Sequence, residues 1–377
     1  MIESLLSLLA GTEKIFALCA AGLAVEYLRP AEKEQPASAI VFNLVWIVNF
    51  VVMTNLAMVL VGRLIPMGIS ALGGPLVTIN FPPGVLGGLA QFALLLLMHD
   101  CSDWPVAFLG SLYAGVVPVA VNTLLTADDY AFMLRDSRAQ AALVSAALLP
   151  TLQAALAQGG HEVGPVVVSR PGDALPAGCT DFGALLATQA PAAAAADTHA
   201  DEAAFWLYSS GSTGKPKGTV HTQANLYWTA ELYGKAVLGL TEADTVFSAA
   251  KLFFAYGLGN ALTFPLSVGA SVVLMAERPT PQATFKRMTD NQPTVFYGAP
   301  TGFAGMLASP KLPQRQQVSI RLVSSAGEAL PAELGERWKA HFGVDIVDGI
   351  GSTEMLHIFL SNRPGRVRYG TTGWPVD

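Results

Sequence analysis

The sequence predicts an α/β protein with parallel sheets flanked by helices, preceded by an apolar helical segment. From residue 99 onward, short apolar runs alternate with amphipathic stretches, which is the pattern of a parallel sheet covered on both faces. The glycine- and serine-rich stretch YSSGSTGKPKG at 208–218 directly follows the strand-like run AAFWL. Between Gln35 and His99 the only charged residue is Arg63, so the first part of the chain differs sharply in composition from the rest.

Composition excludes several classes of function. The net charge of −6 leaves no overall basic surface for a nucleic acid. The 3 cysteines, Cys19, Cys101 and Cys179, are scattered singly, so neither a disulfide framework nor a zinc site is expected. We therefore expect no nucleic-acid partner and a reducing environment for the α/β part.

We expect three parts: an apolar helical membrane segment at 1–98, a first α/β subdomain at 99–200 and a second at 201–377. The apolar run at 38–62 is long enough to cross a bilayer, which takes about 20 residues. The alternative is a buried helix in a large soluble core. The run FALLLLMHD at 92–100 is ambiguous, because periodicity does not separate the end of a membrane helix from the first strand of the sheet.

The apolar segment, up to LLMHD at 96–100, resembles the start of the sterol desaturase and fatty acid hydroxylase family. That resemblance implies a membrane di-iron oxygenase, whose metals need clustered histidines. No two of the 6 histidines lie within five residues of each other. The hydroxylase activity is therefore not expected to accompany the resemblance.

The segment 99–200 carries the clearest local signals. Thr126 is a predicted N-cap, because acidic residues follow it and arginines end the same amphipathic stretch. The expected elements are helices at 103–117 and 126–139, strands at 118–122, 141–148 and 164–170, and a patternless loop or linker at 171–200.

The loop at 208–218 has the chemistry of a phosphate cradle. A P-loop is excluded, because Lys215 is followed by Pro216 instead of the hydroxyl residue that binds magnesium. Backbone amides and the hydroxyls of serine and threonine remain available to wrap phosphate oxygens, and two lysines add positive charge. A generic glycine-serine linker is the weaker alternative, since linkers rarely follow a buried strand.

YSSGSTGKPKG resembles the phosphate-binding signature of AMP-forming acyl- and aryl-CoA synthetases, within the adenylate-forming superfamily. Three further segments follow in the family's order: KLFFAYGLGN at 251–260, SSAGEALP at 324–331 and DGIGSTEMLHIF at 348–359. From about residue 100 to its end, the chain is most similar to the benzoate and 4-hydroxybenzoate CoA ligases. The resemblance implies the large N-terminal domain of an adenylate-forming enzyme.

The resemblance also implies roles for individual residues. Catalytic roles fall to Lys217, Thr353 and Glu354. Nucleotide contacts fall to Ser209, Ser210, Gly211, Ser212, Thr213, Gly214, Lys215, Glu328 and Asp348. Contacts with the aromatic substrate fall to Phe254, Ala255, Tyr256, Gly351, His357 and Ile358. Magnesium would be held by Thr213 and Glu354.

The implied chemistry needs such residues. Attack of a carboxylate on the α-phosphate of ATP brings two anions together, so cations and oriented amides are required where negative charge accumulates. Each residue alone has a simpler explanation: a Thr-Glu pair often starts a helix, and a histidine such as His357 is often structural. Their order and spacing together favour the site.

The implied function is ATP-dependent activation of a benzoate-like acid to acyl-AMP and then acyl-CoA, in the degradation of aromatic compounds, with ATP, Mg²⁺ and coenzyme A. In these ligases a C-terminal domain with an adenylation lysine follows YGTTGWPVD, and this chain ends at Asp377, so impaired ligation is expected. The alternatives are a membrane-anchored nucleotide-binding protein without catalysis, or the remnant of a membrane hydroxylase fusion. The expected location is the cytoplasmic face of a membrane if residues 1–98 insert, and otherwise the cytoplasm.

Overall fold

The computed structural model describes residues 92–172, 175–190, 192, 194–210 and 214–377. Residues 1–91 of the predicted membrane segment, including the run at 38–62 and most of the hydroxylase resemblance, lie outside these residues. Among the described residues, no helix combines the length and the apolar character needed to cross a bilayer.

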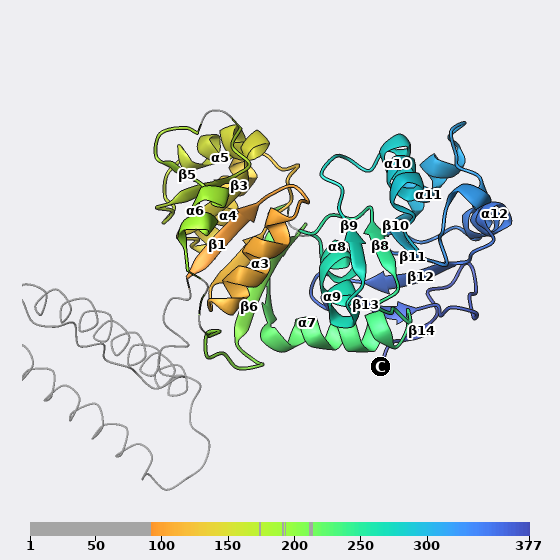
Figure 1. The fold of residues 1–377 in the computed structure, drawn as a ribbon. Coiled ribbons are helices and arrows are strands. Elements are labelled where there is room, and N and C mark those ends of the chain that lie inside the picture. The colour runs from red at the N-terminus through yellow and green to blue at the C-terminus, as the bar shows by residue number, and fades with distance from the viewer. Residues whose placement is uncertain (1–91, 173–174, 191, 193, 211–213) are drawn as a thin grey trace, which may run out of the picture. The chain divides into compact units, whose positions relative to one another are not determined.

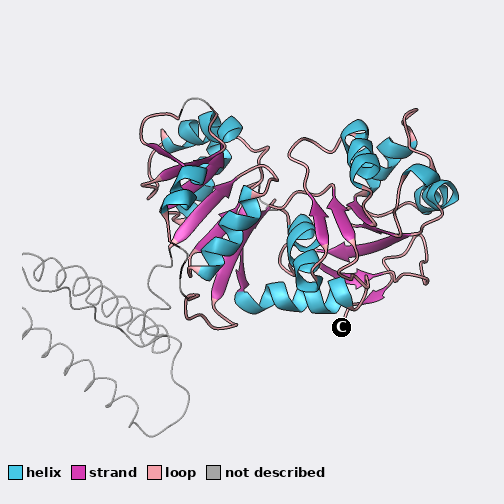
Figure 2. Cartoon of the chain, in the orientation of Figure 1, coloured by secondary structure: helices cyan, strands magenta, loops and turns pink. Residues whose placement is uncertain are grey.

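Two seven-stranded sheets organise the described part of the chain (Figures 1 and 2). The first has the order β5-β4-β3-β1-β2-β6-β7, and the second the order β14-β13-β12-β11-β10-β8-β9. The strands of the first sheet are β1 (Ala93–Leu97), β2 (Val117–Ala120), β3 (Ala141–Ser145), β4 (Val166–Ser169), β5 (Cys179–Asp181), β6 (Ala203–Ser209) and β7 (Lys217–Thr222). Those of the second are β8 (Thr245–Ser248), β9 (Ser271–Val273), β10 (Val295–Gly298), β11 (Leu322–Ser325), β12 (Ile346–Gly351), β13 (Ile358–Ser361) and β14 (Trp374–Pro375).

Most neighbouring strands run parallel, as the sequence predicts. The exceptions are the pairs β6–β7, β12–β13 and β13–β14, which are antiparallel. The first sheet also extends beyond residue 200, because β6 and β7 add to its edge next to β2. Both stretches predicted to bind nucleotide phosphates therefore lie at places where a sheet changes from parallel to antiparallel pairing.

Helices cover both faces of each sheet. In the first sheet α3 and α6 pack on one face and α4 and α5 on the other, while α10, α11 and α12 pack on one face of the second sheet. The α-helices are α3 (Asp103–Tyr113), α4 (Ala127–Ser137), α5 (Leu149–Leu156), α6 (Phe182–Thr188), α7 (Gln223–Thr229), α8 (Ala255–Leu258), α9 (Phe264–Val268), α10 (Pro281–Asn291), α11 (Pro300–Leu307) and α12 (Ala332–Phe342). Two 3₁₀ turns (Ala146–Leu148, Arg315–Gln317) and two π-helical turns (Ala230–Lys235, Gly259–Thr263) complete the elements.

The ambiguous run at 92–100 contains a strand. β1 pairs with β2 on one side and β3 on the other, and Leu95, Leu96 and Leu97 are completely buried. A strand that is buried on both faces needs apolar residues at every position, which explains why the run resembles a membrane helix in sequence. Residues 93–97 therefore belong to the α/β fold.

The stretch 171–200 differs from the predicted loop. It contains β5 and α6, and the Asp181 carboxylate caps α6 by accepting from the backbone N–H of Gly183 at 2.7 Å. The Thr126 cap, in contrast, is confirmed: its hydroxyl accepts from Asp129 N at 3.3 Å, and the Asp129 carboxylate accepts from Thr126 N at 3.0 Å. The predicted strand at 141–148 ends at Ser145 and continues as a 3₁₀ turn.

Candidate active site

The predicted phosphate loop joins two paired strands. Ser209 ends β6 and lies opposite Lys217, the first residue of β7, so the loop spans residues 210–216. A Cβ atom at Gly218 would lie 2.9 Å from the Trp206 ring, so only glycine lets β7 pass this side chain. The middle of the loop (Gly211, Ser212 and Thr213) lies outside the described residues.

The ends of the loop lie next to α4. The Lys215 ammonium lies 5.7 Å from the centre of the Phe132 ring, and the Tyr208 hydroxyl donates to the Asp136 carboxylate at 2.7 Å. Gly214 has a φ of 84°, in the region that favours glycine. Ser210 and Lys217 are exposed. Both lysines are therefore positioned by β7 and α4, and Lys217 faces solvent.

Glu354 lies next to this loop. Its side chain is exposed, and the pKa of its carboxyl group is lowered by its own backbone N–H, by the Ser352 hydroxyl and by the Ser209 hydroxyl. The carboxylate is therefore ionised and close to the last residue of β6. The structure brings together Ser209 and Glu354, which are separated by most of the second subdomain in sequence.

The surroundings of Glu354 are compatible with magnesium bound through a nucleotide. Mg²⁺ is usually held by one or two carboxylates together with substrate phosphates and water, not by an all-protein cage. Within the described part of the chain, no three histidine, cysteine or acidic side chains come close enough to hold a metal by themselves. Glu354 would thus be the protein carboxylate in a shared coordination shell. The second predicted ligand, Thr213, lies outside the described residues.

The predicted adenine contacts lie at the ends of adjacent strands. Asp348 on β12 is opposite Ser325 on β11, and the stretch that contains Glu328 begins directly after β11. Burial raises the pKa of Asp348 to about 6, against the opposing effect of the Ser325 hydroxyl and nearby backbone N–H groups. Glu328 accepts from the Thr301 hydroxyl at 2.6 Å. These carboxyl groups are close to the same edge of the second sheet.

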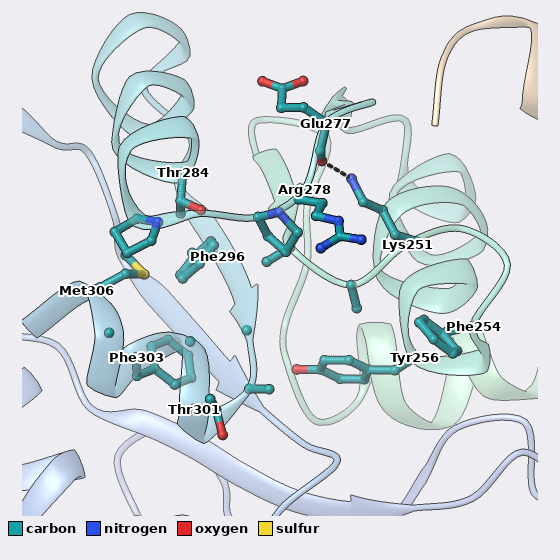
Figure 3. Close-up of a pocket in the computed structure, with 18 of the residues that line it drawn as sticks. Lys251, Phe254, Tyr256, Glu277, Arg278, Thr284, Phe296, Thr301, Phe303 and Met306 are labelled. Carbon is teal, nitrogen blue, oxygen red and sulfur yellow. Dashed lines mark hydrogen bonds between the residues drawn. The ribbon is translucent and has the colours of Figure 1, made fainter. Parts of the chain in front are cut away.

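The predicted aromatic-acid contacts divide between two cavities. Phe254 and Tyr256 line a large cavity of about 970 Å³ (Figure 3), whereas His357 and Ile358 line a smaller one of about 290 Å³ together with Glu354. The two groups meet where the Tyr256 and His357 rings lie 5.5 Å apart. Ala255 is buried beside them. The residues therefore form a shared wall, with Glu354 on the side of the smaller cavity.

His357 is buried and neutral. Burial lowers its pKa to about 3, against a small opposing effect of the Tyr256 backbone. None of the described residues makes a hydrogen bond with either ring nitrogen. An unpaired polar group in this position is unfavourable unless a ligand or water satisfies it, so the ring of His357 has hydrogen-bonding capacity to spare.

Gly351 also has a structural reason to be a glycine, in addition to the substrate contact predicted for it. A Cβ atom there would lie 2.5 Å from the backbone oxygen of His357, at the irregular pairing of β12 with β13. The glycine therefore permits the close approach of two backbones. Its effect on the aromatic pocket comes through the position of His357.

Comparison with known proteins identifies the family. Residues 90–377 match the sequence model of the AMP-binding enzyme family. The chain belongs to the AMP-binding enzyme family. It is 56% identical over 291 residues to the benzoate–CoA ligase of Thauera aromatica, covering 77% of this chain and 54% of that protein. It is 46% identical over 297 residues to a 4-hydroxybenzoate–CoA/benzoate–CoA ligase of Rhodopseudomonas palustris, covering 78% of this chain and 53% of that protein.

A solved relative of this AMP-binding enzyme has the same fold. The crystal structure of a benzoate CoA ligase from Burkholderia xenovorans superposes with a TM-score of 0.71 at 59% identity, covering 78% of this chain and 57% of the other. The chain spans about half the length of the curated relatives that it matches. The sequence-based assignment to AMP-forming aryl-CoA synthetases is therefore confirmed at the level of the family.

One buried group of this AMP-binding enzyme was not predicted. His221 is the next-to-last residue of β7 and lies near the segment of Thr353 and Glu354, and the side chain of Asn225 on α7 binds its ring. In the sequence this pair lies in HTQAN at 221–225, where a histidine four residues before an asparagine is not a distinctive signature. Only the three-dimensional proximity of β7 to the 353–354 segment indicates a role.

Proposed function

We propose that this AMP-binding enzyme activates a benzoate-like acid with ATP and passes the acyl group to coenzyme A, within the degradation of aromatic compounds. The observation that carries the proposal is the meeting of the phosphate loop, through Ser209, with the ionised Glu354. The 56% identity to a benzoate–CoA ligase supports an aromatic acid as the substrate.

The first step joins two anions. The acid's carboxylate oxygen attacks the α-phosphorus of ATP, a P–O bond forms, and the bond to pyrophosphate breaks with its electrons leaving on pyrophosphate. Magnesium, when bound with the nucleotide, supplies positive charge beside the phosphate oxygens. Glu354 holds that charge in place, while Lys217 and the loop amides and hydroxyls, with Thr353, bind and orient the phosphates.

The aromatic acid fits the wall shared by the two cavities. Tyr256 and Ile358 offer apolar surface for a flat ring, and the neutral His357 offers an N–H to its carboxylate. A neutral donor orients the carboxylate without transferring a proton to it, so the nucleophile stays ionised. This arrangement favours attack toward the side on which Glu354 lies.

The larger cavity supports a second, bulkier substrate. Ligand pockets of about 300–1,000 Å³ hold molecules much larger than benzoate, and this cavity has a volume of about 970 Å³. Figure 3 shows Lys251 and Arg278 on one side of it and Phe303 and Met306 on another. We assign this space to coenzyme A, whose thiol would reach the acyl group past Phe254.

Filling this cavity should weaken coenzyme A binding selectively. Gly302 lines the cavity, and a Cβ atom there meets nothing within 4 Å, so Gly302→Leu should enter open space without a clash. We expect the dissociation constant for coenzyme A, measured by calorimetry, to rise about tenfold, which corresponds to about 1.4 kcal/mol. Gly302→Ala is the control and should bind normally. Equal affinity in the leucine variant would contradict the assignment.

The proposed function is tested by isotope exchange. Benzoate-dependent exchange between ATP and labelled pyrophosphate requires reversible formation of acyl-AMP, so only an adenylating enzyme supports it. We expect exchange with benzoate and none without an aromatic acid. Binding of magnesium-ATP without any exchange, over a panel of benzoates, would instead identify a nucleotide-binding protein without catalysis.

A further inference from the structure

Asp100 is a buried acidic residue that the proposed chemistry does not use. It follows β1, at the carboxyl end of a strand inside the first sheet, and the residue is only 4% exposed. Carboxylates are rarely buried to this extent unless a charge or a hydrogen-bond donor satisfies them. Its contacts therefore point to a specific structural task.

The hydrogen-bond partner of Asp100 lies after β8, a strand of the second sheet. Asp100 Oδ1 accepts from the backbone N–H of Leu252 at 3.2 Å, in a buried position and across 152 residues of sequence. Leu252 is completely buried, in the same apolar cluster as Trp104 on α3 and Phe205 on β6. The hydrogen bond and this shared core together fasten the start of the stretch KLFFAYGLGN to the first sheet.

The turn that contains this hydrogen bond packs tightly against α8. Phe254 N donates to the Lys251 carbonyl at 3.0 Å, and a Cβ atom at Gly257 would lie 2.0 Å from the same carbonyl oxygen. Lys251 Nζ donates to the backbone oxygens of Met275 and Glu277, the latter at 2.7 Å. Because no space separates the turn from α8, a displacement of the turn would be transmitted to the helix.

The same turn and the start of α8 form a wall of the candidate site. Lys251, Phe254 and Tyr256 line the large cavity (Figure 3). The Tyr256 ring also lies 5.5 Å from the ring of His357, which lines the smaller cavity. At its far end the Tyr256 hydroxyl donates to the Ser324 hydroxyl at 3.2 Å. The position of this wall therefore depends on where the turn is held.

We propose that Asp100 is a positioning residue for the aromatic wall formed by Phe254 and Tyr256. Its carboxylate holds the turn by accepting from Leu252 N, which has apolar surroundings. Without an acceptor this buried N–H would be unpaired, which is costly, so the turn would shift toward another partner. The effect on an aromatic acid rests on the proposed function, whereas the effect on the turn does not.

Three substitutions separate the acceptor from the volume and the charge of the side chain. Asp100→Asn keeps an acceptor oxygen at the same reach and removes only the charge. Asp100→Leu fills a similar space without an acceptor. Asp100→Ser keeps a polar group that is too short to reach Leu252, and it keeps the test decisive if the leucine variant does not fold. Asp128→Leu, which replaces an exposed aspartate on α4, is the control.

The first measurement is amide hydrogen exchange without ligand, with the Val323 amide inside the second sheet as the reference for global stability. Relative to Val323, we expect exchange at Leu252 to be at least about tenfold faster in Asp100→Leu and Asp100→Ser, because a hydrogen bond to a charged acceptor is lost. In Asp100→Asn the acceleration should stay below about fivefold. An unchanged ratio in the leucine and serine variants, or equal acceleration in all three, would overturn the role of the acceptor.

The second measurement is the affinity for benzoate and for a non-hydrolysable ATP analogue with magnesium, by calorimetry. We expect Asp100→Leu and Asp100→Ser to weaken benzoate binding by about five- to tenfold and nucleotide binding by less than about twofold, with benzoate affinity recovered in Asp100→Asn. Equal loss of both affinities, or faster exchange with unchanged benzoate affinity, would overturn the link to the aromatic wall. A wild-type chain that binds no aromatic acid would contradict the proposed function, while the exchange rates would still decide whether Asp100 holds the turn.

Discussion

Glu354→Gln is expected to lower benzoate-dependent ATP–pyrophosphate exchange on the order of 100-fold, because it removes the ionised carboxylate next to Ser209. Loss of a single electrostatic group that stabilises a transition state typically costs about 3 kcal/mol. Glutamine has nearly the same shape as glutamate, so the fold should be unaffected. The measurement is the exchange rate at saturating benzoate over a series of magnesium concentrations.

The magnesium series distinguishes the role of the carboxylate. If Glu354 holds the metal, excess magnesium should partly restore exchange in the glutamine variant. Glu333→Gln, an exposed carboxylate in the first turn of α12, is the control and should exchange at the wild-type rate. Wild-type exchange by Glu354→Gln would remove the central residue from the proposed mechanism.

Arg321→Met is expected to lower the free energy of unfolding by about 3 kcal/mol, because it leaves a buried carboxylate without its charge partner. Arg321 Nε donates to Asp244 Oδ1 at 2.7 Å, and its second nitrogen donates to the other oxygen. The Asp244 side chain is 3% exposed, whereas that of Arg321 is 44% exposed. The Arg321 guanidinium thus provides hydrogen bonds and a positive charge to the Asp244 carboxylate, which water reaches poorly.

The loss of unfolding free energy in Arg321→Met should depend on pH in a defined direction. Burial raises the pKa of Asp244, but hydrogen bonds from Arg321, Thr294 and the Thr241 backbone outweigh it and lower the pKa to about 2. A lowered pKa in the folded state means that the stabilisation is present above the unfolded pKa of 3.8. It is lost as the pH falls from about 4 to about 2, so the difference between Arg321→Met and wild type should shrink over that range.

Urea unfolding at pH 7 and at pH 3 measures both effects. Lys339→Met removes a more exposed partner, since the Lys339 and Asp345 side chains are 56% and 27% exposed, and it should cost below about 1 kcal/mol. An Arg321 variant as stable as the Lys339 variant would show that Asp244 is satisfied by its neutral neighbours alone.

Much of the fold was predictable, because alternating elements leave a strong local pattern. The limits are physical. β1 is apolar at every position since the sheet buries both of its faces, so its sequence resembles that of a membrane helix. α6 was missed, because its short apolar run lacks periodicity, and only the Asp181 cap marks its start. The N-cap at Thr126 was predicted correctly, because Thr126 and its partner Asp129 lie close together in the sequence.

The candidate site was predictable as a set of residue types but not as an arrangement. The resemblance named Ser209 and Glu354, and the structure places them together. The close approach of the Gly351 and His357 backbones could not be predicted, because a linear pattern does not reveal which backbone lies alongside a glycine. The position of His221 was also missed, because its neighbours Thr353 and Glu354 are more than a hundred residues away in the sequence.

The contact of Trp206 with Gly218 bears on how the phosphate loop tolerates changes in length. Slippage of β7 by one residue would bring the side chain of Lys217 or Thr219 against the indole, so the strands cannot shift to absorb an insertion. A loop transplanted from a relative must therefore span the fixed distance between Ser209 and Lys217 by itself. The two strands should thus keep their pairing when the loop sequence between them is exchanged.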